Sequence, residues 1–143
     1  MKQENKELLL RYLSMALPCG VIINTPNGDG YLNSINQTIF GNEYGINIKP
    51  TRRDYFNDEE NNFKPFLRPM SRMTDEEKKE FDNFCVIDEF AWKGNSEIGY
   101  KNQAIIMSNA INWLLNNHFD IFGLIHKGLA IEVTEENNPY ENK

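Results

Sequence analysis

Apolar residues recur at helical spacing in the stretch that begins at Ala104. They follow the i, i+3, i+4, i+7, i+8 pattern of an amphipathic helix: Met107, Ala110, Ile111, Leu114 and Leu115. The pattern predicts a helix over 104–117, which Asn116 and Asn117 can end because Asn tolerates the left-handed conformation. We expect four of its residues to be largely buried against the N-terminal helix and the sheet: Met107, Ile111, Trp113 and Leu114.

A second, shorter helix is predicted over 121–127. Asp120 stands at its N-cap, where a carboxylate accepts hydrogen bonds from the first-turn amides of residues 122 and 123. His126 falls in the last turn and Gly128 follows it, as is typical of a helix C-terminus. Apolar residues then alternate with Ala130 and Glu132 over 129–133, which predicts a half-buried strand.

The N-terminal half shows a helical stripe over 6–17, stopped by Pro18 and Gly20, and then apolar runs with strand character at 21–23, 31–40 and 46–48. A strong turn signal at 25–30 separates the first two runs. A further helix begins after Thr74, which forms a capping box with Glu77. The segment 49–73 shows no clear period, and we expect it to be irregular. The segment 85–103 predicts a long irregular connection, which can hold a short strand or a functional flap.

These elements predict a single α+β domain over 1–134, with an antiparallel sheet of three to five strands and helices packed on one face. Residues 135–143 are mostly polar, and they predict a frayed tail.

Composition and charge limit the classes of function that the chain can have. The chain has 143 residues, 40% of them hydrophobic, and a net charge of −6, which argues against a broad nucleic-acid-binding or anionic-membrane surface. Its two cysteines, Cys19 and Cys85, lack metal-ligand spacing and are typical of free thiols in a reducing compartment. No leader pattern opens the chain and no apolar run could cross a bilayer, so the sequence predicts a soluble cytoplasmic protein.

His118 and Asp120 are the candidate catalytic residues. A histidine and a carboxylate two positions apart can form an acid–base pair or supply two metal ligands. A structural role explains each equally well, since Asp120 caps a helix and His118 follows one. Because Asp120 cannot fully cap and ligate at once, we expect it to cap, His118 to be partly exposed, and no metal or other cofactor to be bound.

Basic and aromatic residues are interleaved between positions 52 and 72, as in some proteins that bind single-stranded nucleic acid. The candidate binding residues are Arg52, Arg53, Arg68 and Arg72. Acidic residues in the same segment weaken the positive electrostatic potential of these arginines. The arginines can instead pair with the acidic helix that follows, at Asp75, Glu76 and Glu80.

Six short stretches stand out together: residues 17–21 (LPCGV), 64–74 (KPFLRPMSRMT), 112–115 (NWLL), 118–120 (HFD), 123–125 (GLI) and 128–130 (GLA). In these stretches the chain resembles a family of short, uncharacterised proteins of gut anaerobic bacteria and of their prophages or mobile elements. The resemblance implies a bacterial or phage origin and a cytoplasmic location, and it implies no reaction.

The leading hypothesis is therefore a small soluble accessory protein of a phage or mobile element that binds another protein. One alternative is a metal-dependent or acid–base enzyme centred on His118 and Asp120. Another is a binder of single-stranded nucleic acid through the 52–72 segment. The sequence leaves the oligomeric state open.

Overall fold

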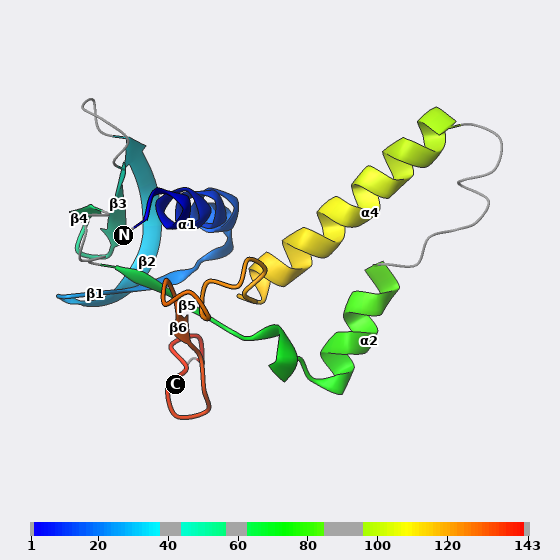
Figure 1. Cartoon of the computed structure of the whole chain (residues 1–143). Coiled ribbons are helices and arrows are strands. Elements are labelled where there is room, and N and C mark those ends of the chain that lie inside the picture. Colours follow the sequence, from blue (N-terminus) through cyan, green and yellow to red (C-terminus); the bar gives the residue numbers. More distant parts are fainter. Residues whose placement is uncertain (1, 38–43, 57–62, 85–95, 142–143) are drawn as a thin grey trace.

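Six strands form one sheet in the part of the chain that this computed structural model describes, which is residues 2–37, 44–56, 63–84 and 96–141. Their order is β4-β3-β2-β1-β5-β6, and every neighbouring pair is antiparallel except β5 with β6 (Figure 1). The strands are β1 (Ile22–Thr25), β2 (Gly28–Gln37), β3 (Tyr44–Lys49), β4 (Arg53–Phe56), β5 (Lys64–Leu67) and β6 (Ile131–Glu132). The predicted α+β domain is confirmed, with one strand more than the upper end of the expected range.

Three α-helices accompany the sheet in the described residues. They are α1 (Gln3–Ala16), α2 (Asp75–Phe84) and α4 (Ser96–Asn116). Helix α1 covers one face of the sheet, whereas α2 and α4 lie beside each other and extend away from it as an arm (Figure 1). None of these helices combines the length and apolar character needed to span a membrane.

The main core lies between α1 and the sheet. Helix α1 buries one stripe of side chains: Leu9, Tyr12, Leu13 and Ala16. They pack against the inward residues of the strands, among them Ile23, Leu32, Ile46 and Ile48. As predicted, the helix stops before Pro18, which cannot continue the α-helical ladder, and Gly20 then turns the chain into β1 with a φ of 70°.

The segment 49–73 contains two strands, so the prediction that it is irregular is wrong. Strand β4 has one buried residue, Tyr55, and this leaves no alternation to detect. Strand β5 is buried at three successive positions because it pairs with β1 on one side and β6 on the other. Pro65 within β5 reads as a strand breaker, since proline cannot donate to a ladder.

Helix α2 begins as predicted, with a reciprocal cap. The Thr74 amide donates to Glu77 Oε1 at 3.0 Å, and the Glu77 amide donates to Thr74 Oγ1 at 3.1 Å. Two amides that lack a helical partner are therefore satisfied by side chains.

We expect Thr74→Ala to lower the free energy of unfolding by about 1 kcal/mol, because the Glu77 amide loses its acceptor. Urea denaturation followed by circular dichroism measures the change. Ser71→Ala, at an exposed residue just before the cap, is the control. Equal stability of the two variants would mean that the cap does not form in solution.

Helix α4 starts at Ser96, so the first part of the predicted connection 85–103 lies outside the described residues and the rest is helical. Trp113 and Leu114 are buried as predicted, at 9% and 8% exposure. The predicted partners are wrong, because both pack in a separate cluster with Phe119, Met73 and Phe81 at the base of the arm. Ile111 is half-buried and packs on the main core. The expectation for Met107 is wrong, because it lies on the free arm with 54% of its surface exposed.

The second predicted helix, 121–127, is absent, and these residues form a series of turns. Asp120 nevertheless caps backbone amides, those of Leu124 and Ile125 rather than of residues 122 and 123. The predicted strand at 129–133 is reduced to β6, which pairs with β5 in parallel.

The tail after residue 134 is not frayed as far as Glu141. Its Tyr140 hydroxyl accepts from the Ile22 amide at 2.9 Å and donates to the Phe66 carbonyl at 2.7 Å. This hydroxyl bridges β1 and β5 beyond the Ile23–Pro65 pair, where their ladder ends. Composition could not indicate this, since one tyrosine among polar residues has no period.

Candidate functional site

His118 lies in the αL conformation two residues after the end of α4, with a φ of 63°. Its amide donates to the Leu115 carbonyl at 3.0 Å and so closes the last helical turn. Its ring stacks on Tyr140, with centroids 3.6 Å apart and planes 9° from parallel. Burial, with a further contribution from the nearby Arg68 cation, lowers the pKa of His118 to about 4. The imidazole is therefore neutral at pH 7.

This shift predicts a loss of stability in acid. Below its unfolded-state pKa of 6.5, His118 takes up its proton in the unfolded chain before it does so in the folded one. The free energy of unfolding should therefore fall between pH 6.5 and pH 4, by about 2 kcal/mol after allowance for partial exposure. The measurement is urea denaturation across this range. His118→Asn, which suits the αL conformation and does not titrate, should have a flatter profile; identical profiles would contradict the assignment.

Asp120 holds the turns after α4 together. Its Oδ1 accepts from the Leu124 amide at 2.8 Å, and its Oδ2 accepts from the Ile125 amide at 2.9 Å. Only 9% of the residue is exposed. Both carboxylate oxygens are thus committed to the backbone, and among the described residues no hydrogen bond joins Asp120 to His118.

A metal site at these residues finds no support in the geometry. The described residues contain no group of three or more His, Cys, Asp or Glu side chains that could hold an ion. His126 is exposed and lies at the far end of the turns that Asp120 caps. His118 and Asp120 therefore act in the structure as separate anchors, one for the tail and one for the turns.

Arg68 joins the base of the arm to the sheet. Its guanidinium makes two hydrogen bonds to Glu77 of α2, at 2.7 and 2.9 Å, and lies 4.2 Å from the centre of the Phe119 ring. Its backbone amide donates to the His118 carbonyl, and its carbonyl accepts from the Asp120 amide. The alternative that an arginine pairs with the acidic helix holds for Arg68, with Glu77 as the partner instead of the residues named from the sequence.

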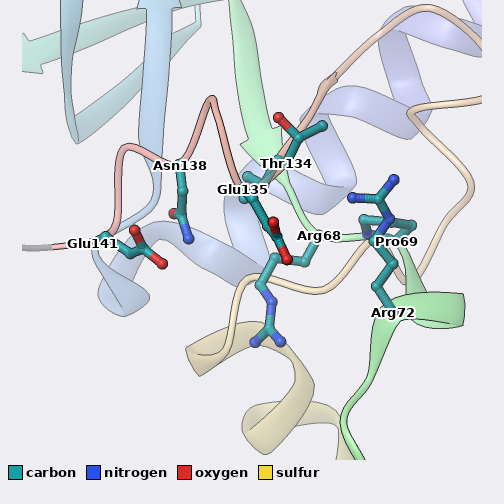
Figure 2. A pocket seen from close by; sticks show the side chains of 8 residues that line it. Arg68, Pro69, Arg72, Thr134, Glu135, Asn138 and Glu141 are labelled. Carbon is teal, nitrogen blue, oxygen red and sulfur yellow. The ribbon is translucent and has the colours of Figure 1, made fainter.

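The four candidate nucleic-acid-binding arginines do not form one patch. Arg52 and Arg53 lie where β3 turns into β4, at one edge of the sheet. Arg68 follows β5, and β3, β2 and β1 lie between that strand and β4. Figure 2 shows that the guanidinium groups of Arg68 and Arg72 point in different directions.

A polar depression surrounds Arg68 (Figure 2). It consists of two adjoining hollows of about 250 Å³ and 290 Å³, which share Arg68, Asn138 and Glu141. The first also has Glu135 and Arg72 in its wall. Because both carboxylates and arginines line it, and Arg68 is already paired with Glu77, the depression does not select one class of charged ligand.

The exposed surface of α4 carries little charge, and it mixes apolar side chains with polar ones such as Ser108, Asn109 and Asn112. Tyr100 and Met107 are 66% and 54% exposed, and Ala104, on the same side, is also exposed. We call the row Tyr100, Ala104, Met107 and Ile111 the outer stripe. Its spacing of four, three and four residues keeps its members on one side of a helix. A second row packs inward: Ile106, Ala110 and Trp113.

Two signals for this surface were present in the sequence but were missed. The outer stripe begins at Tyr100, inside a segment that we expected to be irregular. Met107 was assigned to the core because a stripe that continues from buried residues reads as one buried face. Ile105, 58% exposed, lies about 130° around the helix from the outer stripe and does not belong to it.

Comparison with models of known protein families, with curated proteins and with solved structures finds no match for this chain. The function is therefore inferred from the geometry of the described residues.

Proposed function

We propose that this protein is a small accessory protein that acts by binding another protein through the outer stripe of α4. The observation that carries the proposal is the exposure of Tyr100 and Met107 on a helix that extends beyond the sheet (Figure 1). A helix with apolar residues on more than one side is stable in water when each apolar side is covered. Helix α2 packs on the inward row at Trp113 through Phe81, whereas Tyr100 and Met107 remain exposed.

The charge of α4 supports a protein partner. Its 21 residues include two charged ones, Glu97 and Lys101, of opposite sign. Protein–protein interfaces are depleted in charge at their centre and enriched in Tyr and Met, which matches the stripe. Nucleic acid requires clustered basic residues, and no such cluster lies on α4.

The enzyme alternative has less support than protein binding. Asp120 uses both oxygens to hold backbone amides, and His118 is stacked on Tyr140 and held neutral by its lowered pKa. Neither group faces the other across a cleft. The link to a phage or mobile element stays a prediction from the resemblance.

Site-specific photo-crosslinking in the cells that encode the protein tests this function. A photoreactive amino acid replaces Met107 in one variant and the exposed Lys79 of α2 in the other. We expect a discrete protein adduct from position 107 and none from position 79. Absence of any adduct at 107, or equal adducts at both positions, would contradict binding through the outer stripe.

A further inference from the structure

We infer that residues 134–141 form a releasable latch on the sheet, in which Tyr140 holds β1 and β5 one hydrogen bond short of further pairing. When the latch leaves the sheet, the Ile22 amide and the Phe66 carbonyl bond to each other directly. The chain therefore has two arrangements, one latched and one with a longer β1–β5 ladder. The latch is separate from the outer stripe, so it adds to the proposed function without depending on it.

Pro65 determines which pairs of residues can exchange hydrogen bonds between β1 and β5. The strands are antiparallel, with Ile23 opposite Pro65 at the end of their ladder. A hydrogen-bonded pair exchanges two N–H···O bonds, and proline has no amide, so Ile23–Pro65 is a non-hydrogen-bonded pair. The two kinds of pair alternate along an antiparallel ladder. The next pair, Ile22–Phe66, therefore falls at a position where the Ile22 amide can donate to the Phe66 carbonyl.

The Tyr140 hydroxyl lies between these two backbone groups. It accepts from the Ile22 amide at 2.9 Å and donates to the Phe66 carbonyl at 2.7 Å. The oxygen is thus inserted into the next bond of the ladder, as a bridging water can be. The ring of Tyr140 packs on the apolar cluster that contains Ile22 and Phe66, and so it keeps the strands apart at this point.

Tyr140 is the main attachment of the latch to the sheet. A turn closes between Thr134 and Asn137, and the Tyr140 amide donates to Asn138, so these contacts lie within the latch. In the part of the chain that the structure describes, the hydrogen bonds from the latch to other segments are the two of the Tyr140 hydroxyl. Other polar side chains of the latch line the depression around Arg68 instead of packing on the sheet (Figure 2). Loss of one side-chain contact is therefore enough to free the segment.

Release leaves few polar groups without a partner, so the two arrangements lie close in free energy. The Ile22 amide and the Phe66 carbonyl exchange a shared hydroxyl for each other, and the hydroxyl bonds to water. The His118 ring stacks on Tyr140, and its Nδ1 atom is buried with no hydrogen-bond partner among the described residues. Loss of the stack opens this atom to water, which offsets part of the apolar contact that Tyr140 gives up.

NMR scalar coupling across hydrogen bonds tests the closing of the ladder in the purified full chain. Tyr140→Ala removes the ring together with its oxygen, and we expect a coupling between the Ile22 nitrogen and the Phe66 carbonyl carbon that the wild type lacks. A chain that ends at Asn138 should give the same coupling. Tyr140→Phe is the matched control, because its ring still separates the strands and no oxygen joins them.

The control should show no coupling, and its Ile22 amide should exchange with solvent about 10- to 100-fold faster than in Tyr140→Ala. Absence of the coupling in Tyr140→Ala, with Ile22 exchange as fast as in Tyr140→Phe, would overturn the closing of the ladder.

Relaxation dispersion of the wild-type chain tests whether the latch opens by itself. We expect the signals of Ile22 and Phe66 to report exchange with a minor state populated at about 1–10%. The chemical shifts of that state should match those of Tyr140→Ala, in which the latch is released. Flat dispersion profiles, or a minor state with different shifts, would overturn the releasable latch and would leave binding through the outer stripe unaffected.

Discussion

Trp113→Ala should lower the free energy of unfolding by about 3–5 kcal/mol, the usual cost of deleting a buried aromatic side chain. Trp113 is 9% exposed and joins two segments that are far apart in the sequence. Its ring lies 5.8 Å from that of Phe119 and 5.7 Å from that of Phe81 on α2. The substitution leaves a cavity at the point where the arm meets the sheet, and the neighbouring rings cannot fill it without moving the arm.

Chemical denaturation of the two matched variants Trp113→Ala and Tyr100→Ala measures this effect. Tyr100 is an aromatic residue of the same helix, but 66% of its surface is exposed, so its loss should change the stability of the single chain by less than about 0.5 kcal/mol. Similar losses in both variants would show that the cluster at the base of the arm is not packed as described.

Tyr140→Phe should lower the free energy of unfolding by about 2–4 kcal/mol, although it removes a single oxygen atom. The hydroxyl satisfies the Ile22 amide and the Phe66 carbonyl together, and each group loses its partner when the oxygen is removed. Burial raises the pKa of the Tyr140 phenol above its usual value, so the hydroxyl keeps its proton and can donate to Phe66 at any ordinary pH.

The control for this change is Tyr31→Phe. Tyr31 lies on the neighbouring strand β2, opposite Ile22, and is 52% exposed. Its hydroxyl can bond to water in the folded and in the unfolded chain, so the substitution should change the free energy of unfolding by less than about 0.5 kcal/mol. Equal, small effects of the two substitutions would indicate that the tail is not docked on the sheet in solution.

Local signals in the sequence were sufficient where one short stretch determines the structure. The cap of α2 forms from Thr74 and Glu77, two residues within a stretch of four that supply both donors and both acceptors. The stop of α1 follows from Pro18 and Gly20 for the same reason. Asp120 was correctly expected to bind backbone amides, but the position of those amides depends on turns that are shaped by packing.

The sequence alone did not predict the features whose structure depends on a partner strand or on a distant residue. Strand β5 is recognisable only once β1 and β6 flank it, because Pro65 and the burial of successive residues conceal its period. The docking of Tyr140 depends on strands more than 70 residues away in the chain. Burial of Met107 could not be judged from periodicity, since an apolar stripe gives the same pattern whether its cover comes from its own chain or from another.

Met107 and Met70 are the exposed methionines among the described residues, and they provide the most direct test of the outer stripe as an open surface. The purified chain is labelled with ¹³C at its methionine methyl groups, and a soluble paramagnetic probe is added. We expect the methyls of Met107 and Met70 to relax similarly, in line with their exposures of 54% and 41%. Protection of Met107 relative to Met70 would contradict the assignment of α4 as an open binding surface.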